Sequence, residues 1–177
     1  MPNAARPLAG RRALITGGGT GVGADLARGF ASAGAEVVVA GRRRDPLDRV
    51  AAETGARPLT CDVTDEASVT ALFEAAGRCD IVIANAGAAD SAPFARLSRD
   101  QFDAVLAVNL TGTFLTLREG LRRMEGWGRL IAVASTAGLK GYPYVAHYPA
   151  AKHGVVGLVG ALAQELGPGG ITANALC

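Results

Sequence analysis

The sequence is poor in aromatic residues, which make up 5% of its 177 positions, although 49% of the residues are hydrophobic and 24 are glycine. Such a chain must build its core from small aliphatic side chains that pack beneath several tight turns, because glycine permits the backbone conformations that turns require. We therefore expect residues 1–177 to form one soluble globular domain.

Cysteine is also scarce, with Cys61, Cys79 and Cys177 as its three occurrences. Their odd number and their spacing fit neither a disulfide framework nor a metal site, and reduced thiols are typical of the cytosol. No uncharged run approaches the roughly 20 apolar residues that a membrane helix needs, and the N-terminal region lacks the apolar stretch of a signal peptide. We expect a cytoplasmic protein with no membrane partner.

Excess charge of one sign is absent, because the formal net charge is only +2. The chain as a whole therefore has little electrostatic attraction to nucleic acid. A basic nucleic-acid-binding protein that uses the arginines at 42–44 is one interpretation, but the weak net charge argues against it. Lysine is the rarer cation, since only Lys140 and Lys152 occur among 18 Lys and Arg residues.

Short apolar runs alternate with helical segments along the whole chain. Strands are predicted at 13–15, 36–40, 57–61, 80–84, 130–134 and 171–176. Helices are predicted at 21–33, 45–55 with Asp45 as N-cap, 64–77, 98–124 and 148–166. Strict alternation with right-handed crossovers requires a parallel sheet covered by helices on both faces. We expect a doubly wound (Rossmann) α/β fold with strand order 3-2-1-4-5-6, whose ligand site lies at the carboxyl ends of strands 1 and 4.

The first strand passes into the first helix through a glycine-rich turn. Glycine lets a backbone approach a pyrophosphate closely, and the helix N-terminus attracts anions. The spacing G-x-G-x-x-G/A is met only loosely, whereas T-G-x-x-x-G-x-G fits well. The candidate cofactor-binding residues here are Thr16, Gly17, Gly19, Thr20, Gly21, Val22 and Gly23. The alternative is a turn that only packs the helix on the sheet.

The end of the second strand indicates which cofactor fits. An acidic residue at this position would accept a hydrogen bond from a ribose 2′-hydroxyl, but the sequence has Gly41 followed by Arg42. A guanidinium is the natural partner of a 2′-phosphate dianion. We therefore expect NADP(H) in preference to NAD(H), with Arg42 as the phosphate ligand. A solvated arginine cluster is the alternative.

A candidate acid–base pair lies at the start of the last predicted helix, where Tyr148 and Lys152 are four positions apart and share a face. A free phenol is a poor acid–base group near neutrality, with a pKa of about 10, but a neighbouring ammonium favours the phenolate. The alternative is an ordinary amphipathic helix start with a solvated lysine. His147 is interpreted as pocket lining or as a surface residue.

Two further polar residues have two possible roles each. Ser135, which follows the fifth strand, either holds a substrate carbonyl oxygen or stabilises its own turn. Asn109 lies in an apolar helical stretch, where a buried amide needs partners. Its amide therefore either bonds neighbouring backbone or serves a water relay.

Taken together, these motifs resemble the short-chain dehydrogenase/reductase family over the whole chain. The segment 84–87 (Ala-Asn-Ala-Gly) is similar to its N-N-A-G motif, with Ala84 replacing the first Asn. The resemblance implies that Asp62 and Val63 contact the adenine and that Asn85, Ala86 and Gly87 border the cofactor. It implies a catalytic tetrad in which Asn109 holds a relay water, Ser135 orients the carbonyl, Tyr148 transfers the proton and Lys152 assists Tyr148 and binds the nicotinamide ribose.

Segments 138–144 and 151–157 look most like bacterial ketoreductases of the 3-oxoacyl or polyketide type. The implied activity is an NADP(H)-dependent interconversion of a ketone and a secondary alcohol, with a small-molecule carbonyl or alcohol as substrate. The family continues past the position of Cys177 with a Pro-Gly turn, a substrate-covering segment and a last strand, so we expect a truncated or partial chain, or a natural remnant. The alternative is a dinucleotide-binding module or a catalytically inactive subunit.

The two long helices predicted at 98–124 and 148–166 suggest self-association. Their small and apolar residues exceed what one sheet face needs for cover, as Gly154, Gly157, Val159, Gly160 and Ala161 illustrate. The family resemblance points to the same helices. We expect a homodimer or homotetramer.

Overall fold

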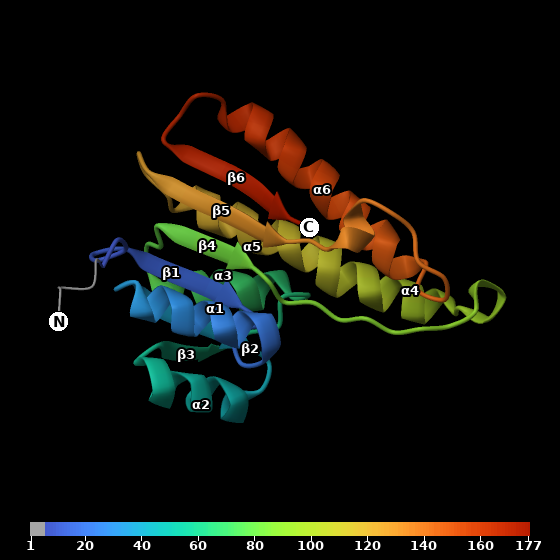
Figure 1. Ribbon diagram of the computed structural model, residues 1–177, viewed down its shortest axis with the longest axis horizontal. Coiled ribbons are helices and arrows are strands. Elements are labelled where there is room, and N and C mark those ends of the chain that lie inside the picture. Colours follow the sequence, from blue (N-terminus) through green and yellow to red (C-terminus); the bar gives the residue numbers. More distant parts are fainter. Residues whose placement is uncertain (1–5) are drawn as a thin grey trace.

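Six parallel strands form one sheet in the computed structural model, which describes residues 6–177 (Figure 1). Their order is β3-β2-β1-β4-β5-β6, as predicted. The strands are β1 Arg12–Thr16, β2 Glu36–Gly41, β3 Arg57–Thr60, β4 Ile81–Ala84, β5 Gly128–Val133 and β6 Ile171–Leu176. The doubly wound fold class is confirmed.

The helices connect the strands as right-handed crossovers require. They are α1 Gly21–Ser32, α2 Arg44–Thr54, α3 Glu66–Ala76, α4 Arg99–Leu106, α5 Gly112–Arg122 and α6 His147–Leu166, with the short turns η1 Phe94–Arg96, η2 Ala107–Thr111 and η3 Thr136–Gly138. The predicted N-cap of α2 was wrong, because Arg43 occupies that position and Asp45 lies in the first turn. An acidic residue is favoured both at the N-cap and in the first turn, because at either position its charge interacts favourably with the helix dipole.

Alternating residues of each strand point to two separate cores. Leu14, Val82 and Leu130 pack with apolar residues of α3, α5 and α6. Ile15 and Ile83 pack on the opposite face with residues of α1 and α2. Helices therefore cover both faces of the sheet, as expected of parallel strands.

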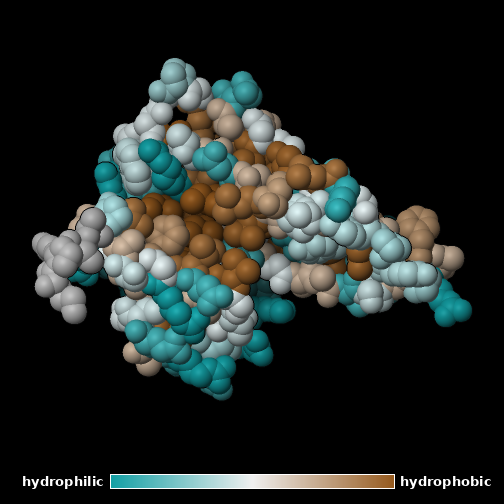
Figure 2. Space-filling model, in the orientation of Figure 1, coloured by the Kyte–Doolittle hydropathy of each residue, from teal (hydrophilic) through white to brown (hydrophobic). Residues whose placement is uncertain are grey.

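The helices cover only part of the sheet face on which α1 and α2 pack. Trp127, Ile131 and Val133, at and along β5, are only partly buried there. Figure 2 shows hydrophobic surface across this part of the sheet, between α1 and β6. Burial consequently alternates along β5 between buried and half-buried residues. Among residues 6–177 no helix combines the length and apolar character that a membrane span requires.

The helix predicted at 98–124 is interrupted by one π-helical turn, η2, which joins α4 to α5. The capping box that begins the segment is present, with Ser98 and Gln101 bonding each other's backbone. A π turn inserts one extra residue, and such turns often occur at functional sites. Apolar spacing alone does not reveal the insertion. Asn109 lies within this turn and is fully buried.

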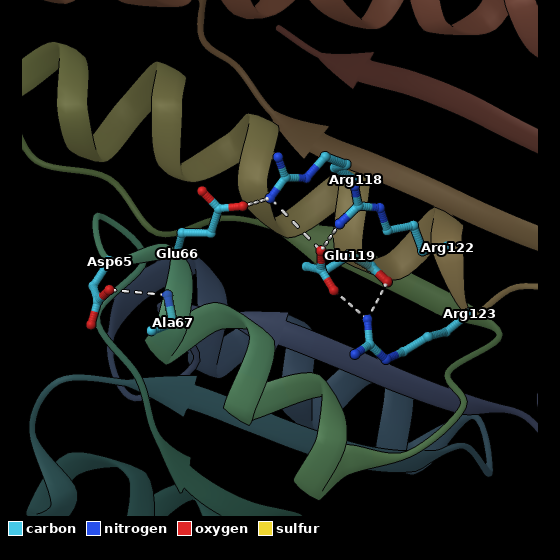
Figure 3. Close-up of polar contacts among 7 residues, drawn as sticks. All are labelled: Asp65, Glu66, Ala67, Arg118, Glu119, Arg122 and Arg123. Atoms are coloured by element: carbon cyan, nitrogen blue, oxygen red, sulfur yellow. Dashed lines mark hydrogen bonds and ion pairs between the residues drawn. The ribbon is translucent and has the colours of Figure 1, made fainter.

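The last turn of α5 carries a buried carboxylate, Glu119, whose side chain is only 4% exposed (Figure 3). Arg122 donates to it over 2.7 Å, and Arg123 donates to its second oxygen. Burial would raise the pKa of Glu119, but the hydrogen bonds and charges of Arg123 and Arg122 outweigh burial and lower it. Arg118 extends the cluster to Glu66 on α3. The cluster therefore ties α5 to α3.

We predict that Glu119→Gln destabilises the fold by about 1–3 kcal/mol at pH 7, the usual range for charged hydrogen bonds. A carboxyl whose pKa is lowered by folding contributes stability above its unfolded pKa of about 4.3, and this contribution is lost as pH falls through the folded pKa. The difference between wild type and variant should therefore shrink below about pH 4. Urea denaturation from pH 3 to pH 7 measures it, and a difference independent of pH would contradict the assignment.

Candidate active site

Two glycines of the turn after β1, Gly17 and Gly23, leave no room for a side chain. A Cβ at Gly23 would lie 2.2 Å from the Gly17 carbonyl oxygen, and one at Gly17 would lie 2.9 Å from the Cα of Ala86. Gly17 also has a φ of 66°, a conformation that favours glycine. Thr20, the N-cap of α1, makes no side-chain capping bond, so its side chain does not occupy the first N–H groups of the helix. The turn thus presents bare backbone at a helix N-terminus.

Two side chains join the ends of β1 and β4 beneath this turn. The buried Thr16 hydroxyl donates to the Ile83 carbonyl oxygen over 3.4 Å and accepts from the N–H groups of Asn85 and Ala86 at 3.1 and 3.2 Å. The Asn85 amide donates to the carbonyl oxygens of Thr16 and Gly17 at 3.0 and 3.3 Å. Thr16 and Asn85 therefore act on the backbone, which they hold in place.

Two cavities, of about 180 and 360 Å³, adjoin along this edge of the sheet. The first contains the candidate residues Gly17, Gly19, Thr20, Arg42, Asp62, Val63, Ala86 and Gly87. The second contains Gly17, Thr20, Val22, Gly23, Asn85, Ala86, Gly87, Asn109, Tyr148 and Lys152. Shared lining makes them one cleft, of a size typical of ligand sites. Of the predicted site residues, Thr16, Gly21 and Ser135 line neither cavity.

The three consecutive arginines after β2 differ in their surroundings. Arg44 forms an ion pair with Asp48 over 2.8 Å. Arg42 and Arg43 line the first cavity, and within residues 6–177 neither makes an ion pair. Hydrogen bonds from the backbone and then the side chain of Thr64 lower the pKa of Asp62, and the charge of Arg42 lowers it further. Arg43 was missed from the sequence, although its position beside Arg42 was a signal.

Lys152 is held beneath Tyr148 at the start of α6. It is 3% exposed, and its ammonium donates to the Val133 carbonyl oxygen over 2.8 Å. The ammonium nitrogen lies 5.6 Å from the centre of the Tyr148 ring. Burial lowers the pKa of Lys152, because an apolar environment disfavours the charged form. The alternative of a solvated lysine is therefore wrong.

Asn109 directs its amide to the loop that follows β4. Its Nδ2 donates to the carbonyl oxygens of Ala88 and Val105 at 2.6 and 2.9 Å. Its Oδ1 is buried and has no hydrogen-bond partner within residues 6–177. A Cβ at Gly87 would lie 2.9 Å from this oxygen, so glycine is needed there. An unpaired carbonyl oxygen at the edge of a cavity is a suitable place for an ordered water.

Ser135 and His147 lie outside the lining of both cavities and differ in their surroundings. The Ser135 hydroxyl oxygen accepts from the Ala137 N–H over 3.1 Å, which stabilises η3 and leaves its own proton free to be donated. His147 is fully buried and lines neither cavity, so its interpretation as pocket lining or surface was wrong. Consecutive helical residues point about 100° apart, so the helix start that turns Tyr148 to the cleft turns His147 away from it.

The fold and the cleft define a doubly wound α/β protein with a ligand site where the strand order reverses between β1 and β4. The chain belongs to the short chain dehydrogenase family, whose model matches residues 11–177. It is thus an oxidoreductase of the short-chain dehydrogenase/reductase type.

Two curated relatives and one solved structure illustrate the similarity. D-threitol dehydrogenase of Mycolicibacterium smegmatis is 37% identical over 96% of this chain and 69% of its own length. The 3-oxoacyl-[acyl-carrier-protein] reductase FabG of Rickettsia bellii is 31% identical over 96% of this chain and 72% of its own. A short-chain type dehydrogenase/reductase from Mycobacterium marinum has 37% identity and a TM-score of 0.87 over 95% of this chain and 72% of that structure.

Proposed function

We propose that this protein is an NADP(H)-dependent oxidoreductase that interconverts a ketone and a secondary alcohol. The observation that carries the proposal is that Tyr148 and Lys152 line the same cavity as the glycine-rich turn. A proton-transfer group and a dinucleotide-type turn thus face one space. The names of two relatives describe the dehydrogenation of an alcohol and the reduction of a 3-oxoacyl group, which fits this chemistry.

The residues present fit a dinucleotide. The turn at 17–23 ends at the N-terminus of α1, where no side chain of Thr20 caps the helix, so its first N–H groups are suited to a diphosphate. Asp62 and Val63 would border the adenine, and Arg42 would hold a 2′-phosphate, joined by Arg43. Segment 85–87 would border the rest of the cofactor, and Lys152 its nicotinamide ribose.

In the reduction, Tyr148 donates a proton to the carbonyl oxygen, and in the oxidation it takes that proton back. The buried Lys152 ammonium favours the phenolate that remains. The Ser135 hydroxyl donates a hydrogen bond to the same substrate oxygen and thereby orients the carbonyl group. The unpaired Oδ1 of Asn109 holds a water that connects Lys152 to solvent. The nicotinamide, when bound, supplies or accepts the hydride.

We predict that the double variant Gly41→Asp/Arg42→Ala loses preference for NADPH. It removes charge-assisted hydrogen bonds to the 2′-phosphate and adds a repelling carboxylate, so NADPH affinity should fall about 10- to 100-fold relative to NADH. Fluorescence titration with both cofactors measures this change. Arg44→Ala is the control, because Arg44 is paired with Asp48. Undiminished NADPH binding by the double variant would rule out this role for Arg42.

We predict that Tyr148→Phe abolishes turnover while cofactor binding persists. The change removes only a hydroxyl, so fold and NADPH affinity should be retained, whereas ketone reduction should fall by about 10²–10⁴-fold or more. NADPH absorbance at 340 nm with a panel of ketones measures this. Near-native reduction by the Phe variant would contradict the mechanism. A parent chain that binds NADPH but reduces no ketone would instead favour a dinucleotide-binding module or an inactive subunit.

We predict that Lys152→Ala reduces activity in a pH-dependent way. Loss of the ammonium disfavours the phenolate, so residual turnover should partly recover as pH rises, which the Phe variant cannot do. A pH–rate profile compares the two variants. Lys140→Ala, which changes the only other lysine, should leave the profile unchanged. A Lys152→Ala profile parallel to that of wild type would show that the ammonium has no effect on proton transfer.

We also propose that the chain forms a homodimer or homotetramer through α5 and α6. Phe114, Leu121, Leu158 and Ala161 line an apolar groove between these helices. Gly157 and Gly160 have open space around them and are available for such a contact. Gly154 instead packs against Leu110, and Val159 is buried in the core.

We predict sedimentation as a dimer or larger species at micromolar concentration, and dissociation in Leu158→Glu, because a carboxylate buried at such a contact would be unpaired. The same substitution at an exposed position away from the groove, Thr172→Glu, should leave sedimentation unchanged. A wild-type monomer at this concentration would refute the contact.

A further inference from the structure

Two loops at the carboxyl edge of the sheet meet beside the Tyr148 end of the cleft. One follows β4 over residues 85–98 and the other follows β5 over residues 134–146, and both lie at the same end of the molecule (Figure 1). The Ala92 N–H of the first donates to the Tyr144 carbonyl oxygen of the second over 2.8 Å. Both loops also contribute to the lining of the second cavity, through Ala88, Ala89 and Ala134. They therefore form the rim of the space in front of Tyr148.

The rim exposes an unusual amount of apolar surface. Among residues 6–177, seven large hydrophobic side chains are exposed, and four of them belong to these two loops. They are Phe94 at 80%, Leu139 at 65%, Tyr142 at 39% and Tyr144 at 66% exposure. Single exposed hydrophobic residues are ordinary, but four on two loops that both border one cavity favour binding of an apolar ligand there.

Tyr144 is held in a strained conformation at this rim. Its φ of 64° is the only positive value of a non-glycine residue within the described part of the chain. Such a conformation is costly for a bulky residue, and it persists only where surrounding contacts impose it, often at ligand-binding positions. The bond to Ala92 fixes the Tyr144 backbone and leaves its ring exposed.

One part of the second cavity's wall offers no polar side chain to the part of a substrate beyond its carbonyl group. The segment 87–89 that lines it is Gly-Ala-Ala. A polyol chain placed there would leave hydroxyl groups without partners, at a cost in affinity. Lys140 stacks over Tyr142 at 5.1 Å, and Asp90 accepts from Gln101, so these two charged groups of the rim loops are already engaged.

We propose that the substrate is a ketone that carries an apolar chain or ring, and that Tyr144 and Phe94 are specificity-determining residues that cover this substituent. This inference rests on the proposed ketone reduction. It selects between two chemistries found among relatives, since it favours a substituent like the acyl chain of a 3-oxoacyl reductase over the polyol of a threitol dehydrogenase.

The test compares kcat/KM for 2-alkanones from butanone to decanone, and for the polyol ketone erythrulose, with NADPH present. The expected kcat/KM rises by roughly fourfold for each added methylene group until the rim is covered, as burial of a CH₂ predicts. Tyr144→Ala and Phe94→Ala should flatten the series, whereas Tyr144→Phe, which keeps the ring, should retain it. Erythrulose should be a poor substrate. A flat wild-type series, or a preference for erythrulose, overturns the inference.

A second measurement separates this inference from the proposed function. Isothermal titration of the NADPH-bound protein with unreactive N-alkylacetamides of increasing chain length reports binding without turnover. Affinity that rises with chain length and is lost in Tyr144→Ala supports the inference even if no ketone is reduced, in which case only the proposed function fails. Affinity independent of chain length, with ketone reduction intact, overturns the inference alone.

Discussion

The junction between the ends of β1 and β4 is the constraint on which the site depends. There the Thr16 hydroxyl and the Asn85 amide fix the backbone of both strand ends, and the missing side chains of Gly17 and Gly23 let the turn approach segment 85–87. The first cavity of the cleft borders this junction and contains Arg42, and the second cavity borders it as well and contains Tyr148. A side chain inserted between the two strand ends would separate the turn from both.

A second constraint on the site is the buried ammonium group of Lys152. Burial of the Lys152 ammonium disfavours its charged form, and the only hydrogen bond recorded for it within residues 6–177 goes to the Val133 carbonyl oxygen at the end of β5. That bond ties the start of α6, where Tyr148 lies, to the end of β5. The site therefore retains an arrangement that packing alone would not favour.

Much of this arrangement follows from the sequence. The glycine-rich turn and the Tyr148–Lys152 spacing are local patterns, and the alternation of strands and helices indicates the strand order through the rules of the doubly wound fold. The π turn around Asn109 does not, since one inserted residue leaves the apolar character of the segment unchanged. Burial of His147 depends on what packs around the start of α6, which no local pattern encodes. The exposure of Tyr144 likewise depends on a bond between two loops about fifty residues apart in sequence. Contacts between distant segments were thus the part that sequence could not supply.

The two halves of the chain contribute differently to the cleft. Elements from β1 to β4 supply mainly backbone groups and glycines, whereas η2 and α6 supply the side chains of Asn109, Tyr148 and Lys152. Recognition of a diphosphate by backbone tolerates many substitutions outside the glycines, because it requires space and N–H groups. Proton transfer instead depends on particular functional groups. Cofactor binding and proton transfer therefore depend on largely different groups, and Lys152, which we propose to serve both, is the residue at which the two roles meet.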